Sequence, residues 1–215
     1  MTGGRGRWLP TFGGTSGVSG LVYAMTVFDD GTGPALYAGG EFTSASGGPL
    51  NHVARWTGSG WAALGSGTQA SVYALAVFDD GSGPALYAAG DNPASTSFFA
   101  PIMRWNGTSW SSVGNFTLGV SALATIDDGS GPALFAGGPF YTVDGASMHG
   151  IARWDGASWS PLGAGLGPLS VGCNALAQFE DDGIQSLLAG GGFRTSPARD
   201  SYLARWSTER LTRRP

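Results

Sequence analysis

The chain has 215 residues, of which 38 are glycine and 12 are proline, and only 12% are charged. This much glycine and proline excludes a helical bundle or coiled coil, because both residues destabilise a helix interior. The single Cys173 excludes a disulfide-stapled scaffold, and 42% hydrophobic residues exclude a disordered chain. The composition therefore predicts an all-β protein with many short strands and tight turns.

Charge and hydropathy each argue against one kind of partner, nucleic acid and a membrane respectively. The formal net charge is −4 and all eleven basic residues are arginine, whereas a nucleic-acid-binding protein needs a basic face. No apolar run is long enough for a transmembrane helix, and the N-terminal residues lack the apolar segment of a signal peptide. The localisation stays open between a cytoplasmic protein and a piece of a longer exported one.

Four copies of one unit fill the sequence. The segment VYALAVFDDGSGPALYAAG at 72–90 has close counterparts at 22–40 and 120–138 and a degraded one at 173–191. A second signature, IARW or a near variant, follows each copy and places an arginine at Arg55, Arg104, Arg153 and Arg205. We therefore predict one domain over 1–206, with units at about 8–60, 61–109, 110–158 and 159–206. Residues 207–215 form a basic tail.

Each unit is predicted to contain four strands, here called a to d. Strand a (VYALAVF) leads through the turn DDGSGP to strand b (ALYAGG), and a variable loop leads to strand c (IARW). An Asp-Gly or Asn-Gly turn, the strongest short hairpin signal, then leads to strand d (WSPLG). A unit of about 50 residues with four short antiparallel strands is typical of a propeller blade. The predicted fold is thus an all-β, four-bladed β-propeller.

All eight tryptophans lie in the repeat and are expected to be structural. Six form pairs across the c–d turn, which places the two rings directly opposite each other: Trp56 with Trp61, Trp105 with Trp110, and Trp154 with Trp159. Trp206 ends the last strand c, and Trp8 opens the chain as a strand d, so the N-terminal strand is expected to close the last blade. The alternatives are sugar stacking by the tryptophans, and an open segment of a longer array.

These repeats resemble kelch-type repeats of the galactose-oxidase-like propellers. The resemblance lies in a hydrophobic strand, a Gly-Gly at the end of the second strand (Gly39-Gly40) and a paired-aromatic hairpin (Trp56 and Trp61). The sequence is also similar to repeats of the fungal cortical cell-polarity marker family and of bacterial surface proteins. The resemblance implies a propeller fold; propellers serve as scaffolds, lectins and enzymes alike.

No catalytic, cofactor or metal constellation is found. Copper oxidation would need two His, two Tyr and a Cys together, and Cys173 is instead expected to be a buried structural residue. The repeated Asp-Asp-Gly, at 29–31, 79–81, 127–129 and 181–183, favours turn chemistry over a calcium loop, because its acids are adjacent instead of alternating. The turn at Asp155 only partly resembles a sialidase Asp box. Each repeated arginine is expected to bind a carboxylate or carbonyl of the scaffold.

The b–c loops differ between units and mark the candidate ligand face. This face carries Glu41, His52, Asp91, Phe98, Phe99, Tyr141, His149 and Arg194. The predicted function is a non-enzymatic binding module for a protein or glycan, with no cofactor. The alternatives are a fragment of a larger repeat protein without a site of its own and, less favoured, a propeller hydrolase or oxidase. The sequence leaves open a monomer or a ring-completing oligomer.

Overall fold

The protein is all-β in the computed structural model, which describes residues 17–45, 48–91, 99–167, 172–181, 183–193 and 202–207. All regular elements in these ranges are strands, and all their pairings are antiparallel. Within the same ranges, no helix has the length and apolar character needed to cross a membrane. The prediction of an all-β fold with antiparallel sheets is confirmed.

Counted from strand a to strand d, as the sheets contain them and as the units are counted from here on, the first and third units form sheets of the same design. In each, four strands follow one another in the order a-b-c-d. In the first unit these strands are β1 (Val22–Asp29), β2 (Pro34–Gly40), β5 (Val53–Trp56) and β6 (Trp61–Ala63). In the third unit they are β11 (Ala122–Asp127), β12 (Pro132–Gly137), β15 (Ile151–Trp154) and β16 (Trp159–Pro161).

The second and fourth units depart from this count. The second has β7 (Val72–Asp79), β8 (Pro84–Gly90), β9 (Phe99–Trp105) and β10 (Trp110–Thr117), and its sheet gains two strands of the third unit, β13 (Thr142–Val143) and β14 (Ala146–Ser147). The fourth has three strands, β17 (Cys173–Asp181), β18 (Ile184–Gly191) and β19 (Leu203–Trp206). With the small β3 (Ser44–Ala45) and β4 (Gly48–Pro49) pair, the described residues form five sheets. Trp8 and the predicted closing strand lie outside them.

Two of the b–c loops contain hairpins, which the sequence analysis did not predict. The β13–β14 hairpin turns at Asp144 and Gly145, both with positive φ, and pairs through Val143 with Phe116 of β10. In the first unit, the β3–β4 hairpin pairs in the same way with Val18, through Ala45. The Asp-Gly dipeptide at 144–145 is a hairpin signal that predicts such a turn.

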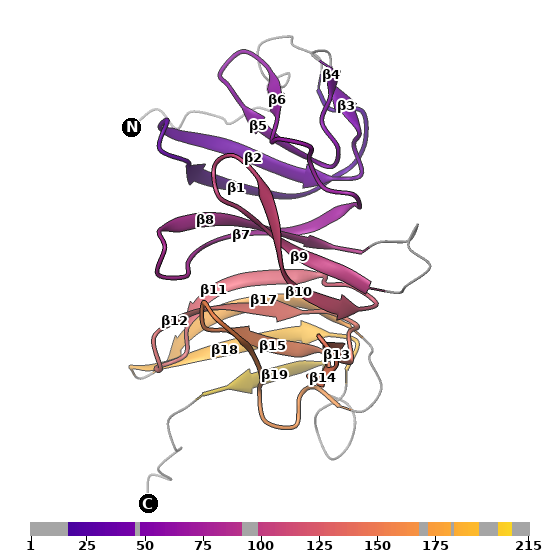
Figure 1. Cartoon of the computed structure of the whole chain (residues 1–215). Helices are drawn as coiled ribbons and strands as arrows, with labels where there is room; N and C mark the ends of the chain where they lie inside the picture. Colours follow the sequence, from indigo (N-terminus) through magenta and orange to yellow (C-terminus); the bar gives the residue numbers. More distant parts are fainter. Residues whose placement is uncertain are drawn as a thin grey trace, which may run out of the picture.

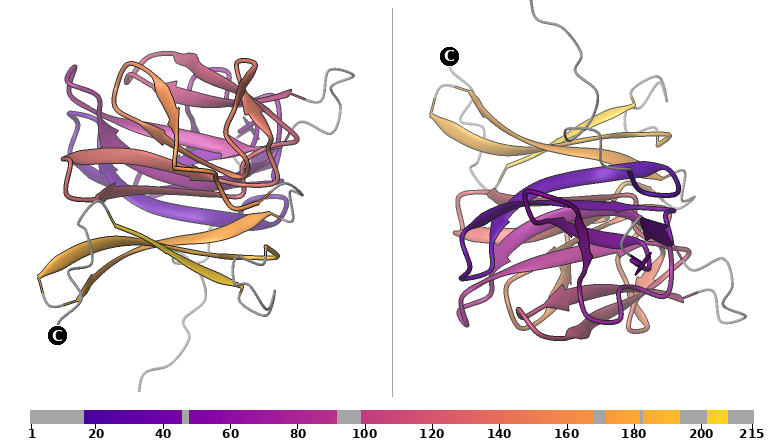
Figure 2. Two further views of the ribbon diagram at one scale, coloured as in Figure 1. Left: turned by 90° about the horizontal axis from the view of Figure 1, so that it is seen from below. Right: turned by 90° about the horizontal axis from the view of Figure 1, so that it is seen from above.

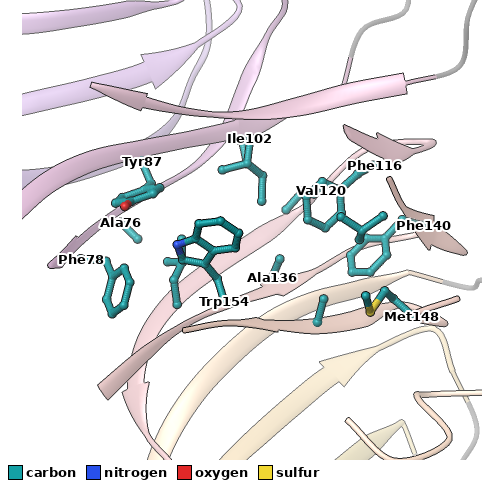
Figure 3. Close-up of a cluster of buried hydrophobic side chains, with 14 of the residues drawn as sticks. Ala76, Phe78, Tyr87, Ile102, Phe116, Val120, Ala136, Phe140, Met148 and Trp154 are labelled. Carbon is teal, nitrogen blue, oxygen red and sulfur yellow. The ribbon is translucent and has the colours of Figure 1, made fainter. Parts of the chain in front are cut away.

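Consecutive sheets pack face to face through their first strands. β1 lies against β7, β7 against β11, and β11 against β17. Figure 1 shows this succession from the upper to the lower part of the molecule, with the strands running across the view. Each junction buries one hydrophobic cluster. Figure 3 shows the cluster between the second and third sheets, where Tyr87 and Ile102 face Trp154 and Ala136.

The tryptophans hold neighbouring sheets together. Each of the three predicted pairs sits directly opposite across its hairpin, with ring centroids 5.2–5.4 Å apart. The Trp110 indole N–H donates to the Leu64 carbonyl of the first unit at 2.9 Å, and that of Trp159 to the Val113 carbonyl of the second at 2.7 Å. The opposed pairing is confirmed, and the same rings also link one unit to the previous one.

Candidate functional site

A cluster of two tyrosines and two carboxylates lies at the b–c end of the first two sheets. Tyr23 and Tyr73 occupy matching positions near the starts of β1 and β7, and Glu41 and Asp91 directly follow β2 and β8. The Tyr23 hydroxyl donates to Glu41, and the Tyr73 hydroxyl donates to Asp91 Oδ2 at 3.0 Å. The two tyrosine rings meet edge to face, with centroids 5.1 Å apart. The packing of β1 on β7 therefore joins Glu41 and Asp91 into one polar group.

The tyrosine hydroxyls of this cluster are held in the protonated form. Burial, followed by the hydrogen bond to Asp91, raises the pKa of Tyr73 to about 12. The hydrogen bond to Glu41 is the main cause that raises the pKa of Tyr23. At neutral pH each tyrosine is thus a hydrogen-bond donor to a carboxylate, and each carboxylate keeps further lone pairs for another donor.

Asp91 also borders a cavity of about 390 Å³. The other walls come from the loop between β6 and β7, the end of β8, the outer part of β9, and Trp110. Asp91 Oδ1 is buried and accepts no hydrogen bond from the described residues. A buried acceptor without a donor is costly, so such an oxygen next to a cavity points to a ligand or water hydroxyl as its partner.

The other predicted site residues are not brought into this cluster. His52 and His149 are half-buried with φ of 70° and 52°, and the Tyr141 side chain is exposed. In the described part of the chain, no hydrogen bond joins any of these three side chains to Asp91 or Glu41. Phe99 begins β9 opposite Thr117. Phe98 and Arg194 lie outside the described residues.

The sequence analysis singled out Glu41 and Asp91 but missed Tyr23 and Tyr73. A signal for the tyrosines was present, because only the first two units have tyrosine at this position of strand a, where the third and fourth units have Ser121 and Asn174. Their meeting could not be predicted, since it depends on how β1 packs against β7.

The opposite end of the sheets carries the arginines, each paired with a carboxylate of the a–b turn. Arg104 is the best-bonded example: its Nε lies 2.7 Å from Asp80 Oδ2, and its guanidinium donates to the Tyr87 hydroxyl and to Ser82 Oγ. The corresponding pairs are Arg55 with Asp30 at 3.5 Å, Arg153 with Asp128 at 3.7 Å, and Arg205 with Asp181 at 3.3 Å. The prediction of a scaffold carboxylate for each arginine is confirmed.

The acids of these turns are occupied by local bonds. Asp79 Oδ1 accepts the backbone N–H groups of Gly81 and Gly83 at 2.9 and 3.0 Å, and Asp29 and Asp127 repeat this pattern. Burial alone would raise the pKa of Asp80, but hydrogen bonds from Ser82, Tyr87 and Arg104 outweigh it and lower that pKa. The predicted turn chemistry is confirmed in these three units. In the fourth, Asp181 pairs with the arginine, so Glu180 occupies the position of the first aspartate.

Two further residues considered in the sequence analysis, Cys173 and Asp155, have surroundings that fit a role in the scaffold. Cys173 is buried in β17, and burial raises the pKa of its thiol to about 11, which matches the predicted structural role. Asp155 Oδ1 accepts the N–H groups of Ala157 and Ser158, both at 2.8 Å, and so closes the c–d turn of the third unit. The partial resemblance to an Asp box at this turn corresponds to a backbone cap.

Comparison with known proteins gives no relative. No protein-family model, no curated protein and no solved structure matches the chain.

Proposed function

We propose that the chain is a kelch-like β-propeller module that binds a glycan at the end of the molecule bearing the b–c loops. The repeated a-b-c order of the strands, the Gly-Gly at the end of β2 and the face-to-face packing of consecutive sheets support the propeller assignment. In this proposal, each unit is one blade. Closure of the last blade by the strand containing Trp8 stays a prediction.

The ligand proposal rests on the surroundings of Asp91. Its Oδ1 is a buried acceptor without a donor among the described residues, and it borders a cavity also lined by Trp110. A cavity lined by both a carboxylate oxygen and an aromatic ring suits a sugar, because sugar hydroxyls donate hydrogen bonds while the apolar face of the sugar covers the ring. Glu41 and Tyr23 extend the polar surface beyond Asp91.

A binding measurement tests this proposal. A panel of immobilised neutral and amine-bearing oligosaccharides is probed with the wild-type chain, and the best glycan is then titrated against tryptophan fluorescence. We expect saturable binding that Asp91→Asn weakens at least about tenfold, which corresponds to roughly 1.4 kcal/mol.

Asp79→Asn is the matched control, because Asp79 lies at the other end of the same β7–β8 hairpin. It should leave the affinity unchanged. Failure of the wild-type chain to bind any glycan of the panel, or equal affinities of wild type and Asp91→Asn, would overturn the proposal.

A further inference from the structure

The two end sheets of the chain display the two halves of one repeated interface. We call the face that a sheet turns toward the next sheet its forward face, and the face that it turns toward the previous sheet its backward face. At each internal junction, the forward face of one sheet packs on the backward face of the next. At the first junction the forward face is formed by Phe28, Tyr37 and Val53, and the backward face by Leu75, Val77 and Leu86. On the backward face of the first sheet, Ala38 and Ala54 are covered by Phe42, Ala45 and Leu50, but the residues of β1 on that face are covered by no sheet of the described residues. The forward face of the fourth sheet around Phe179 is likewise uncovered in the described residues.

Phe179 shows the uncovered forward face of the fourth sheet. It stands in β17 at the position of Phe28 in β1 and Phe78 in β7. In the next strand, Phe28 pairs with Ala35, Phe78 with Ala85 and Phe179 with Ser186. Phe28 and Phe78 are 6% and 4% exposed, whereas Phe179 is 45% exposed. The guanidinium of Arg205 lies 5.9 Å from the ring centroid of Phe179. Figure 2 shows this sheet at the margin of the molecule in both views.

Val22, Met25 and Val27 show the uncovered backward face of the first sheet. Val22 is 41% exposed, whereas Val72, its counterpart in β7, is 1% exposed. Met25 and Val27 are 66% and 64% exposed, whereas Leu75 and Val77 at the same positions of β7 are packed into a core cluster. A row of large apolar residues on one strand is unusual for a surface and marks an interaction site.

The chain does not cover these faces with each other. Val27 of the first sheet is 64% exposed and Phe179 of the fourth sheet is 45% exposed, so within the described residues the two faces are not packed on each other. The contact between a forward face and a backward face already occurs three times inside the chain, at its three internal junctions. The partner that fits each face is therefore another sheet of the same repeat.

We propose that the chain associates head to tail with a second copy of itself, the backward face around Val27 of one copy packing on the forward face around Phe179 of the other. Such an interface is heterologous, and two copies satisfy all four end faces if the contacts close into a ring. The association rests on packing and is independent of glycan binding.

The test is the mass of the chain in solution, measured by light scattering on a sizing column over a series of concentrations. We expect the wild-type chain at twice the mass of one chain or in a larger assembly, and Val27→Asp and Phe179→Asp each at the mass of one chain. Both substitutions are at exposed sites, so the near-ultraviolet circular dichroism of the tryptophans should show each variant folded.

Leu118→Asp is the matched control. Leu118 is an exposed apolar residue away from both end faces, with a φ of 70° that an aspartate tolerates better than a leucine. It should leave the wild-type mass unchanged. A wild-type chain that stays monomeric over the whole series, as closure of a ring within one chain would require, overturns the proposal, and so does an assembly that neither end-face variant dissociates.

Discussion

Tyr87 and Phe135 occupy the same position in the second strands of successive sheets, and only the tyrosine joins the ion pair at its turn. The Tyr87 hydroxyl donates to Asp80 at 3.1 Å and accepts from Arg104 Nε at 3.2 Å. In the third unit Phe135 has no hydroxyl, and Arg153 Nε is buried with no hydrogen-bond partner among the described residues. The third unit therefore has a defect that one substitution can repair.

Phe135→Tyr is expected to stabilise the protein. The new hydroxyl would lie between Asp128 and Arg153 as the Tyr87 hydroxyl lies between Asp80 and Arg104, and it would give the buried Nε an acceptor. We expect the free energy of unfolding, measured with urea, to rise by about 1 kcal/mol. Tyr87→Phe is the reverse change in the second unit and should lower it by a similar amount or more. A fall with Phe135→Tyr would contradict this account of the turn.

Asp80→Asn should be more damaging than Asp181→Asn. The side chains of Asp80 and Arg104 are both largely buried, so removing the charge leaves an uncompensated guanidinium and lowers the free energy of unfolding by on the order of 3 kcal/mol. Asp181 is mostly exposed, and its pair with Arg205 should contribute at most about 1 kcal/mol. Urea unfolding of the two variants gives the comparison, and equal losses would rule out burial as the reason.

Alkaline pH should destabilise the fold. Burial raises the pKa of Tyr37, Tyr73 and Tyr87 from 10.0 to about 12. The folded state therefore holds protons that the unfolded state has lost, so this stabilisation is complete below pH 10 and disappears as the pH rises toward 12. Titration of tyrosinate absorbance should show at least three tyrosines ionising late in the native protein. All six tyrosines ionising near 10 while the chain stays folded would be the contrary result.

Trp159→Phe tests the link between the second and third sheets. The substitution removes the hydrogen bond from the indole N–H to the Val113 carbonyl and shortens a ring that meets Phe116 edge to face at 5.0 Å. We expect a loss of about 1–3 kcal/mol in the free energy of unfolding. An unchanged value would show that this bond does not stabilise the junction.

The repeated segments allowed most of the local structure to be predicted. The strands, the Asp-Asp-Gly turns and the opposed tryptophans each depend on short-range pattern, and Trp154 and Trp159 pair as their spacing requires. Contacts between units were harder to predict. The sequence gives no distance between Tyr23 and Tyr73, which meet only because β1 packs on β7. In the first three units the arginine pairs with the second aspartate of Asp-Asp-Gly, whereas Arg205 pairs with the first one, Asp181. This difference depends on how far β17 extends.

An equimolar mixture of Val27→Asp and Phe179→Asp chains tests the repeated interface most directly. Each variant keeps one intact end face, and the two intact faces are complementary, so neither variant should associate alone while the mixture should form a pair. Light scattering should therefore show a species of twice the chain mass only after mixing. Variants that stay at the mass of one chain in the mixture, whatever their ratio, would contradict the account.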